Sequence, residues 1–385
     1  MKMKILKILF LIIFCIKIEA AANFDNMLEK AKNQSAIKNY TTRANLHQLS
    51  QKIKAQKNLG IRIYGDSHMA ADFFPNILRN AFFEPNSIGF VYPLQPKYQQ
   101  NLNVKYDFQD FEILNSKISS AEENYPLGGV IAKALKEGAK ISLELSLEKQ
   151  KFNTAFLFRA PSNTNAFHIK DSQGKNYNLR SNKANKWSYK ELELTFPLQI
   201  TALQKDAQLG GYFITNKKGG NLFLDTIAIN GAKSDLWLRW NQKVVSEELK
   251  VLKNDLIILA YGSNDALFGA FDKQIFKDNL KKWFKILKKE NKDAVFMIIS
   301  PPTITQKKGK KYEISPYFFT LRKTLDELAR EEKMLFFDMH KFIEDSGGKN
   351  VWIKQKLSLQ DVHLSISGYE LMARKMVQDL KKLFN

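Results

Sequence analysis

Serine, histidine and aspartate residues stand at two points of the sequence where their types and surroundings suit acyl-transfer chemistry. Ser67 follows a short apolar run in "IRIYGDSHMAADFF" (61–74), and His363 stands two residues after Asp361 near the C-terminal end. A serine hydroxyl needs a base to become a nucleophile, an imidazole can take its proton, and a carboxylate fixes the tautomer of that imidazole. These residues therefore predict a catalytic triad of Ser67, His363 and Asp361.

Two further segments could stabilise the oxyanion that forms when an ester carbonyl is attacked. Gly231 lies in "INGAKSDLW" (229–237), and Asn264 lies in "YGSND" (261–265). A backbone N–H at a glycine and a side-chain amide are both suitable donors for such an oxyanion. We expect an oxyanion hole made of the Ser67 and Gly231 N–H groups and the Asn264 side chain.

Each of these residues also has a purely structural interpretation. Ser67 could cap a helix in a Gly-Asp-Ser turn, and Gly231 and Asn264 could be ordinary turn residues. His68 competes with His363 as the base because it directly follows Ser67. Adjacent side chains at a turn point apart, which favours His363. The sequence leaves open whether His68 lines the pocket.

Alternating strands and helices surround these candidate residues. Continuous apolar runs predict buried strands at "DLIILA" (255–260), "AVFMIIS" (294–300) and "MLFFDMH" (334–340). Apolar residues at helical spacing predict helices over about 69–83, 273–289, 316–333 and 367–383. This alternation is typical of a parallel sheet covered by helices on both faces, and such sheets place their sites beyond the carboxyl ends of the strands. The predicted fold class is an α/β domain of three layers built on a parallel sheet.

A β-rich region interrupts this α/β pattern between about residues 93 and 223. Strands are predicted at "ISLELSL" (141–147), "NTAFLFRAP" (153–161) and "ELELTFPL" (191–198), and "GYFITNKKGGNLFL" (211–224) predicts two strands around a Lys-Lys-Gly-Gly turn. Short strands with little helix indicate a β-sandwich-like module. We predict a helical N-terminal arm over 23–58, a catalytic domain over 59–104 and 223–385, and an inserted module over 105–222.

The first 22 residues have the features of an export signal. Lys2 and Lys4 precede nine apolar residues at 8–16, and Ala20-Ala21-Ala22 offers a cleavage site. Nine residues are too few to span a bilayer, which takes about 20, although an uncleaved anchor is an alternative. The only cysteine, Cys15, lies inside this segment, so we expect no disulfide and no thiolate site in the mature chain. The predicted location is the periplasm.

The chain is strongly basic. Losing residues 1–22 would remove four lysines and one glutamate and lower the formal net charge from +21 to +18. On an exported protein, this charge favours an anionic envelope polymer or membrane surface as a partner, and a lysine-rich surface without a partner is the alternative. We predict no nucleic-acid partner, no stable membrane insertion after signal cleavage, and a monomer. No cluster of side chains has metal-ligand spacing, so no metal or other cofactor is expected.

The four candidate segments together resemble the SGNH (GDSL-type) hydrolase family. The resemblance maps the serine, glycine, asparagine and histidine of that family to Ser67, Gly231, Asn264 and His363. It assigns the acid to Asp361, although the acid and base here are two residues apart where the common pattern has three. An irregular loop can still bring such a carboxylate to the imidazole.

"GDSHMAADFF" (65–74), "IGFVYP" (88–93) and the β-rich insertion look similar to the peptidoglycan O-acetylesterases of Gram-negative bacteria. This resemblance implies removal of acetyl from the C6 hydroxyl of N-acetylmuramic acid in glycan strands, through an acetyl-serine, and a carbohydrate-binding-like insertion. An O-acetyltransferase with the same triad and a non-catalytic glycan-binding protein are the alternatives. In the module, Trp187 and Tyr189 are candidates for sugar stacking or, alternatively, for the core.

Overall fold

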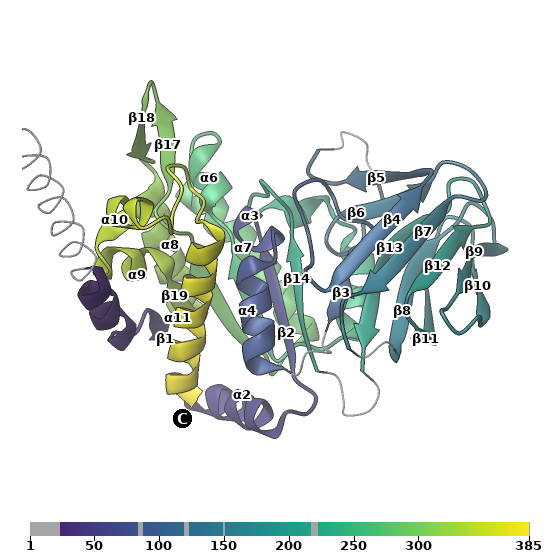
Figure 1. Ribbon diagram of the computed structural model, residues 1–385, viewed down its shortest axis with the longest axis horizontal. Coiled ribbons are helices and arrows are strands. Elements are labelled where there is room, and N and C mark those ends of the chain that lie inside the picture. The colour runs from purple at the N-terminus through teal and green to yellow at the C-terminus, as the bar shows by residue number, and fades with distance from the viewer. Residues whose placement is uncertain (1–23, 84–87, 119–122, 149–150, 217–221, 385) are drawn as a thin grey trace, which may run out of the picture.

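The computed structural model describes residues 24–83, 88–118, 123–148, 151–216 and 222–384, so the expected export signal lies outside it. An α/β body and a β-sandwich lie side by side (Figure 1). Among the described residues, no helix is both long and apolar enough to cross a membrane.

The body is built on a sheet whose strands are parallel except for the edge strand β1. Its strands, in spatial order, are β1 (Ile37–Asn39), β19 (Leu335–Asp338), β16 (Val295–Ser300), β15 (Leu256–Ala260), β2 (Gly60–Gly65) and β14 (Phe223–Ala228). Strands β2, β15, β16 and β19 are buried along their whole length, which explains the apolar runs of β15, β16 and β19.

Helices cover both faces of this sheet. They are α2 (Arg43–Ala55), α3 (Ser67–Ala70), α4 (Phe73–Phe82), α5 (Gln242–Val251), α6 (Ser263–Leu267), α7 (Lys273–Glu290), α8 (Phe318–Glu331), α9 (Met339–Asp345), α10 (Gly348–Lys354) and α11 (Ile366–Phe384), with a 3-10 turn η1 (Leu236–Arg239). Helices α5, α7 and α8 bury their apolar sides in one core, and α4, α9 and α11 bury theirs in the core on the opposite face. This arrangement confirms the predicted fold class.

The β-sandwich packs two antiparallel sheets around a third apolar core. One sheet has the order β10 (Asn176–Arg180), β9 (Asn165–Lys170), β12 (Leu198–Ala202), β7 (Lys140–Leu145) and β4 (Val104–Gln109). The other has the order β11 (Ser188–Thr195), β8 (Lys151–Arg159), β13 (Gln208–Thr215), β6 (Val130–Ala134) and β5 (Phe111–Asn115), and β3 (Gly89–Val91) also pairs with β13.

A buried ion pair connects the sandwich to the body. The Arg62 guanidinium on β2 donates two hydrogen bonds of 2.7 Å to Asp225 on β14, and both side chains are fully buried. Asp225 also accepts a hydrogen bond of 2.8 Å from the N–H of Phe90 on β3. Because β3 pairs with the sandwich, one carboxylate fixes both parts of the molecule to each other.

Three predicted elements differ from the structure. The helix expected over 69–83 is divided into α3 and α4 because Asp72 adopts a left-handed conformation with φ of 62°. The strand expected over 191–198 is two strands in different sheets, separated at Pro197, which has no N–H for a ladder. The strands within 211–224 do not pair, because β13 belongs to the sandwich and β14 to the parallel sheet.

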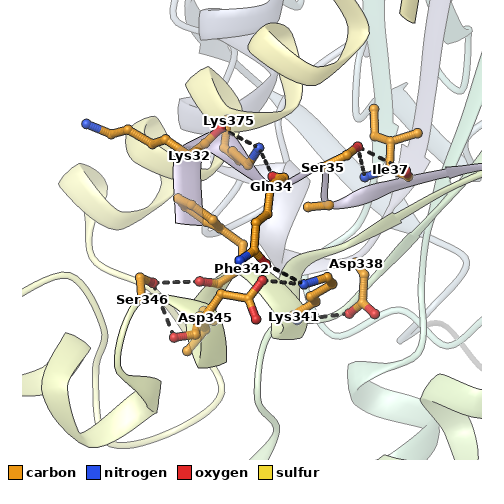
Figure 2. A network of polar contacts seen from close by, with 12 residues as sticks. Lys32, Gln34, Ser35, Ile37, Asp338, Lys341, Phe342, Asp345, Ser346 and Lys375 are labelled. Atoms are coloured by element: carbon orange, nitrogen blue, oxygen red, sulfur yellow. Dashed lines mark hydrogen bonds and ion pairs between the residues drawn. The ribbon is translucent and has the colours of Figure 1, made fainter. Parts of the chain in front are cut away.

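The N-terminal arm is helical over 24–33 and 43–55, as predicted, but it also supplies the edge strand β1. Figure 2 shows how the arm docks on α9 and α11. The buried Lys375 ammonium donates to the carbonyls of Lys32, at 3.2 Å, and Gln34, at 2.6 Å. Asp379 pairs with Lys375 and accepts the N–H of Ala36 at 2.9 Å. No local sequence pattern signals this contact, because its partners are more than 340 residues apart.

A buried carboxyl group in α5 makes the stability of the fold depend on pH. Glu248 accepts the N–H of Leu127 at 2.6 Å, and burial raises its pKa from 4.5 to about 8, although Arg62 opposes the shift. Because the folded pKa exceeds the unfolded one, this group's contribution to stability is full below about pH 4.5 and is lost as pH rises through about 8.

We therefore expect Glu248→Gln to raise the melting temperature by a few degrees at about pH 9 and by much less at about pH 5. The glutamine keeps an acceptor for the Leu127 N–H and removes the buried charge. Thermal melts at both pH values measure the difference. Glu247→Gln is the matched control because Glu247 is the exposed neighbour. A shift of the same size at both pH values would contradict the prediction.

Candidate active site

The strand-to-helix turn after β2 positions Ser67 at the carboxyl edge of the parallel sheet. Asp66 caps α3 by accepting the N–H of His68 at 3.0 Å, so Ser67 is the first residue of the helix. Gly65 lets β2 lie close to β15 here, because a Cβ would stand 3.1 Å from the Ala260 carbonyl oxygen and 2.8 Å from Met69. The serine side chain is left half-buried at the sheet edge.

Ser67, His363 and Asp361 form a hydrogen-bonded chain. Ser67 Oγ lies 3.0 Å from His363 Nε2, and His363 Nδ1 lies 3.1 Å from Asp361 Oδ2. The other carboxylate oxygen of Asp361 accepts the backbone N–H of His363 at 2.9 Å. A spacing of two residues is therefore sufficient, because this tight turn folds the carboxylate back onto the imidazole of its own loop.

A buried lysine that the sequence did not single out supports this catalytic loop (357–365). The Lys349 ammonium of α10 donates to the Asp361 carbonyl, to Ser358 Oγ at 3.3 Å and to the Thr303 carbonyl at 3.3 Å. Burial lowers the pKa of Lys349 from 10.5 to about 8. The loop is also closed on itself, because the N–H of Leu359 donates to the His363 carbonyl at 3.0 Å.

The two candidate oxyanion segments contact each other. Gly231 follows β14 with φ of 76°, a conformation that favours glycine, and Asn264 lies in the first turn of α6. The Asn264 amide donates one hydrogen bond of 2.9 Å to the Ala232 carbonyl. This bond fixes the amide plane and leaves its second N–H for another acceptor.

Ser67, Gly231, Asn264 and His363 line one open cleft of about 810 Å³. The structure thus brings four of the five predicted site residues to a common surface, with Asp361 behind His363. Leu236, Leu238 and Phe268 form an apolar part of the wall. An ester that enters the cleft can reach Ser67 beside the candidate oxyanion donors.

We expect Asn264→Ala to lower kcat by about 10²–10³ with little change in KM, if the amide is an oxyanion donor. Steady-state hydrolysis of p-nitrophenyl acetate measures both constants. Asn264→Asp is a useful companion because it keeps the size of the side chain and replaces the donor with an acceptor. A change confined to KM would mean that Asn264 positions the substrate instead.

His68 is buried and does not take part in this chain of hydrogen bonds. Its Nδ1 lies 2.8 Å from the Tyr369 hydroxyl, and its Nε2 lies 2.8 Å from Ser263 Oγ. Burial holds its pKa well below the usual 6.5, so the imidazole is neutral. The ring bridges α11 and α6 behind the cleft rather than lining it.

Cations around the cleft are a second feature that the sequence did not single out. Lys117, which follows β5 of the sandwich, lies so close to Gly231 that a Cβ there would stand 2.6 Å from its Nζ. Lys233 and Arg239 line the same cleft from the body. The sandwich therefore contributes a side chain to the wall beside the candidate oxyanion donors.

Trp187 and Tyr189 pack against the hydrophobic core, which agrees with the core alternative for both. The Trp187 indole donates to the Asn124 carbonyl at 2.9 Å, and the Arg159 guanidinium lies 4.9 Å from its ring centroid. The Tyr189 ring lies 6.3 Å from that of Phe213.

Two family models match segments of the chain. The GDSL-like Lipase/Acylhydrolase family matches residues 206–371, and the family described as "Peptidoglycan O-acetylesterase, N-terminal" matches residues 87–199. A solved structure of a peptidoglycan O-acetylesterase superimposes with a TM-score of 0.79 and 22% identity, covering 91% of this chain and 99% of that chain. A family two carbohydrate esterase from Clostridium thermocellum, in complex with cellohexaose, is much less similar, with a TM-score of 0.32, 12% identity and coverage of 70% and 98%. No curated protein matches.

Residues 206–371 therefore match a GDSL-type acylhydrolase domain, and the protein is an esterase. Most of the sandwich matches the domain described at the N-terminus of peptidoglycan O-acetylesterases, and both parts of the chain share the fold of the solved peptidoglycan O-acetylesterase.

Proposed function

We propose that the protein removes acetyl groups from the C6 hydroxyl of N-acetylmuramic acid in peptidoglycan, with an acetyl-serine intermediate. The observation that carries the proposal is the chain of hydrogen bonds from Ser67 through His363 to Asp361 at the wall of an open cleft. The match of residues 87–199 to a peptidoglycan O-acetylesterase domain supports the choice of polymer. The basic amino-terminal segment with its apolar run supports export to the periplasm, where this polymer lies.

In the first half of the reaction, His363 Nε2 takes the proton of Ser67, and the serine oxygen attacks the acetyl carbonyl. The N–H groups of Ser67 and Gly231 and the Asn264 amide stabilise the resulting oxyanion. The C–O bond to the sugar then breaks, and the imidazolium gives its proton to the leaving C6 oxygen.

In the second half, His363 takes a proton from water, and the hydroxide attacks the acetyl-serine. The bond to Ser67 breaks, the serine recovers its proton from the imidazolium, and acetate leaves. Asp361 holds the Nδ1–H tautomer throughout, which keeps Nε2 free to accept a proton. A sugar hydroxyl in place of this water would make the enzyme an O-acetyltransferase.

The sandwich is proposed to form one wall of a groove for a glycan strand. Lys117 supports this proposal because it brings the sandwich to the edge of the cleft. A neighbouring domain fixed at two points of the chain can orient a polymer more firmly than a tethered one.

Measuring acetate release from O-acetylated peptidoglycan, with and without a chito-oligosaccharide acceptor, tests the proposed function. An esterase releases acetate at the same rate in both conditions. Transfer of acetyl to the acceptor would identify a transferase. Absence of acetate release, together with hydrolysis of p-nitrophenyl acetate, would refute peptidoglycan as the substrate and leave the esterase chemistry intact.

A further inference from the structure

A small hairpin stands out from the body at the catalytic end of the sheet. Its strands, β17 (Thr305–Lys308) and β18 (Lys311–Ile314), pair only with each other. Figure 1 shows it projecting beyond the rest of the body, at the same end as α6. The proposed chemistry does not use this hairpin.

Both strands of the hairpin are anchored to segments that carry candidate catalytic residues. Thr305 Oγ1 donates to the carbonyl of Gln360 at 2.6 Å, directly before Asp361. Ser315 Oγ, just after β18, donates to the carbonyl of Ala266 at 2.8 Å, in the same short helix as Asn264. The hairpin therefore rises between the catalytic loop and the candidate oxyanion segment.

Strand register identifies which side of the hairpin faces the catalytic loop. Thr305 pairs with Ile314, and Lys307 pairs with Tyr312, so these four side chains share one face. Because Thr305 contacts the catalytic loop, we name this side the loop-facing face. The opposite face carries Gln306, Lys308, Lys311 and Glu313.

The two faces differ in their chemistry. On the loop-facing face, Tyr312 is 39% exposed and Ile314 is 45% exposed, and among the described residues Lys307 has no ion-pair partner. On the opposite face, Lys308 forms an ion pair of 3.3 Å with Glu313. Lys311 on that face also has no ion-pair partner among the described residues, but the face carries no apolar side chain. A two-stranded hairpin is only marginally stable in water, and burying its apolar side chains would stabilise it. Because Tyr312 and Ile314 are instead exposed beside the ammonium group of Lys307, this face has the features of a binding surface.

We propose that the loop-facing face binds the short acidic peptide attached to the glycan of the substrate, an inference that rests on the proposed function. Lys307 supplies an ammonium for a peptide carboxylate, and Tyr312 and Ile314 supply apolar contact for its aliphatic part. When the acetylated sugar lies in the cleft at Ser67, its peptide substituent must leave the cleft over the rim. The basic hairpin stands beside the cleft, anchored at Gln360 and Ala266. In the intact polymer the lactyl carboxyl of the sugar is bound in the amide link to the peptide, so the free carboxylates belong to the peptide.

Kinetics on paired substrates test the proposal. Soluble O-acetylated peptidoglycan fragments are compared before and after an amidase has removed their peptides, with p-nitrophenyl acetate as the small ester. We expect Lys307→Gln to raise KM about fivefold on the peptide-bearing fragments, with kcat unchanged, as for the loss of one well-placed ion pair. Tyr312→Ser is expected to act in the same direction. Neither variant should differ from the wild type on the peptide-free fragments or on the small ester.

Lys311→Gln is the matched control because it removes the same charge from the opposite face of the same hairpin. We expect it to change KM by less than about twofold. Equal losses for Lys307→Gln and Lys311→Gln, equal losses on both kinds of fragment, or no loss at all would each overturn the proposal. A wild-type enzyme that hydrolyses only the small ester would instead refute the proposed function, and this inference with it.

Discussion

Ser67→Ala is expected to lower kcat for acetyl ester hydrolysis by about 10⁴–10⁶, the largest effect of any single substitution in this protein. Without the hydroxyl, no acetyl-serine can form, and the remaining donors act only on direct attack by water. His363→Ala should have an effect of the same order, because the serine then keeps its proton. Acetate release from peptidoglycan and hydrolysis of p-nitrophenyl acetate should fall together.

The double variant of Ser67 and His363 provides the sharper test. If the two residues act as one unit, removing both costs no more than removing either one. The fold should be unaffected, because Ser67 is half-buried at the sheet edge and its hydroxyl bonds to His363 alone among the interactions described. Near-normal turnover by Ser67→Ala with an unchanged melting temperature would refute the triad.

Asp361→Asn is expected to lower kcat by about 10³–10⁴, and the geometry of its turn explains why. The backbone N–H of His363 already donates to Asp361 Oδ1, so an asparagine would place its carbonyl oxygen there. Its NH₂ group would then face His363 Nδ1, at the position that Oδ2 now occupies. The imidazole would be held with its proton on Nε2, the tautomer that cannot accept the serine proton.

Asp361→Ala separates this effect from the simple loss of a partner. Alanine leaves the imidazole free to sample both tautomers, so we expect Asp361→Ala to retain more activity than Asp361→Asn. Measured kcat values for the two variants, at the same pH and with KM determined for each, provide the comparison. An asparagine variant as active as the wild type would mean that another carboxylate is the third member.

Local sequence patterns were sufficient to predict which residues meet at the cleft. Ser67, Gly231 and Asn264 each follow a buried strand of one parallel sheet, and the ends of such strands share an edge whatever the connections between them. His363 was recognisable from Asp361 two residues earlier. The resemblance to the SGNH hydrolases then distinguished these residues from ordinary turn residues and caps.

The supporting contacts could not be predicted in this way, because they join segments that are distant along the chain. Lys349 has the sequence context of a surface lysine, and only the fold buries it beneath the catalytic loop. Lys117 contacts Gly231, which is 114 positions later in the sequence, because the sandwich lies against the body. The division of the predicted helix over 69–83 was missed for a local reason. Asp72 adopts a left-handed backbone conformation there, and its ion pair with Arg79 offsets the strain of that conformation.

The pairing of β1 with β19 has a consequence for the order in which the chain folds. Ile37 pairs with Phe337, so the edge of the body cannot close until about 300 further residues are available. By contrast, the last strand of the sandwich, β13, ends at Thr215, before β14, β15, β16 and β19 have been synthesised. Since chains fold as they emerge, the sandwich can assemble first, while the catalytic sheet waits for its final strands. An incomplete chain would thus hold a finished sandwich and no assembled triad.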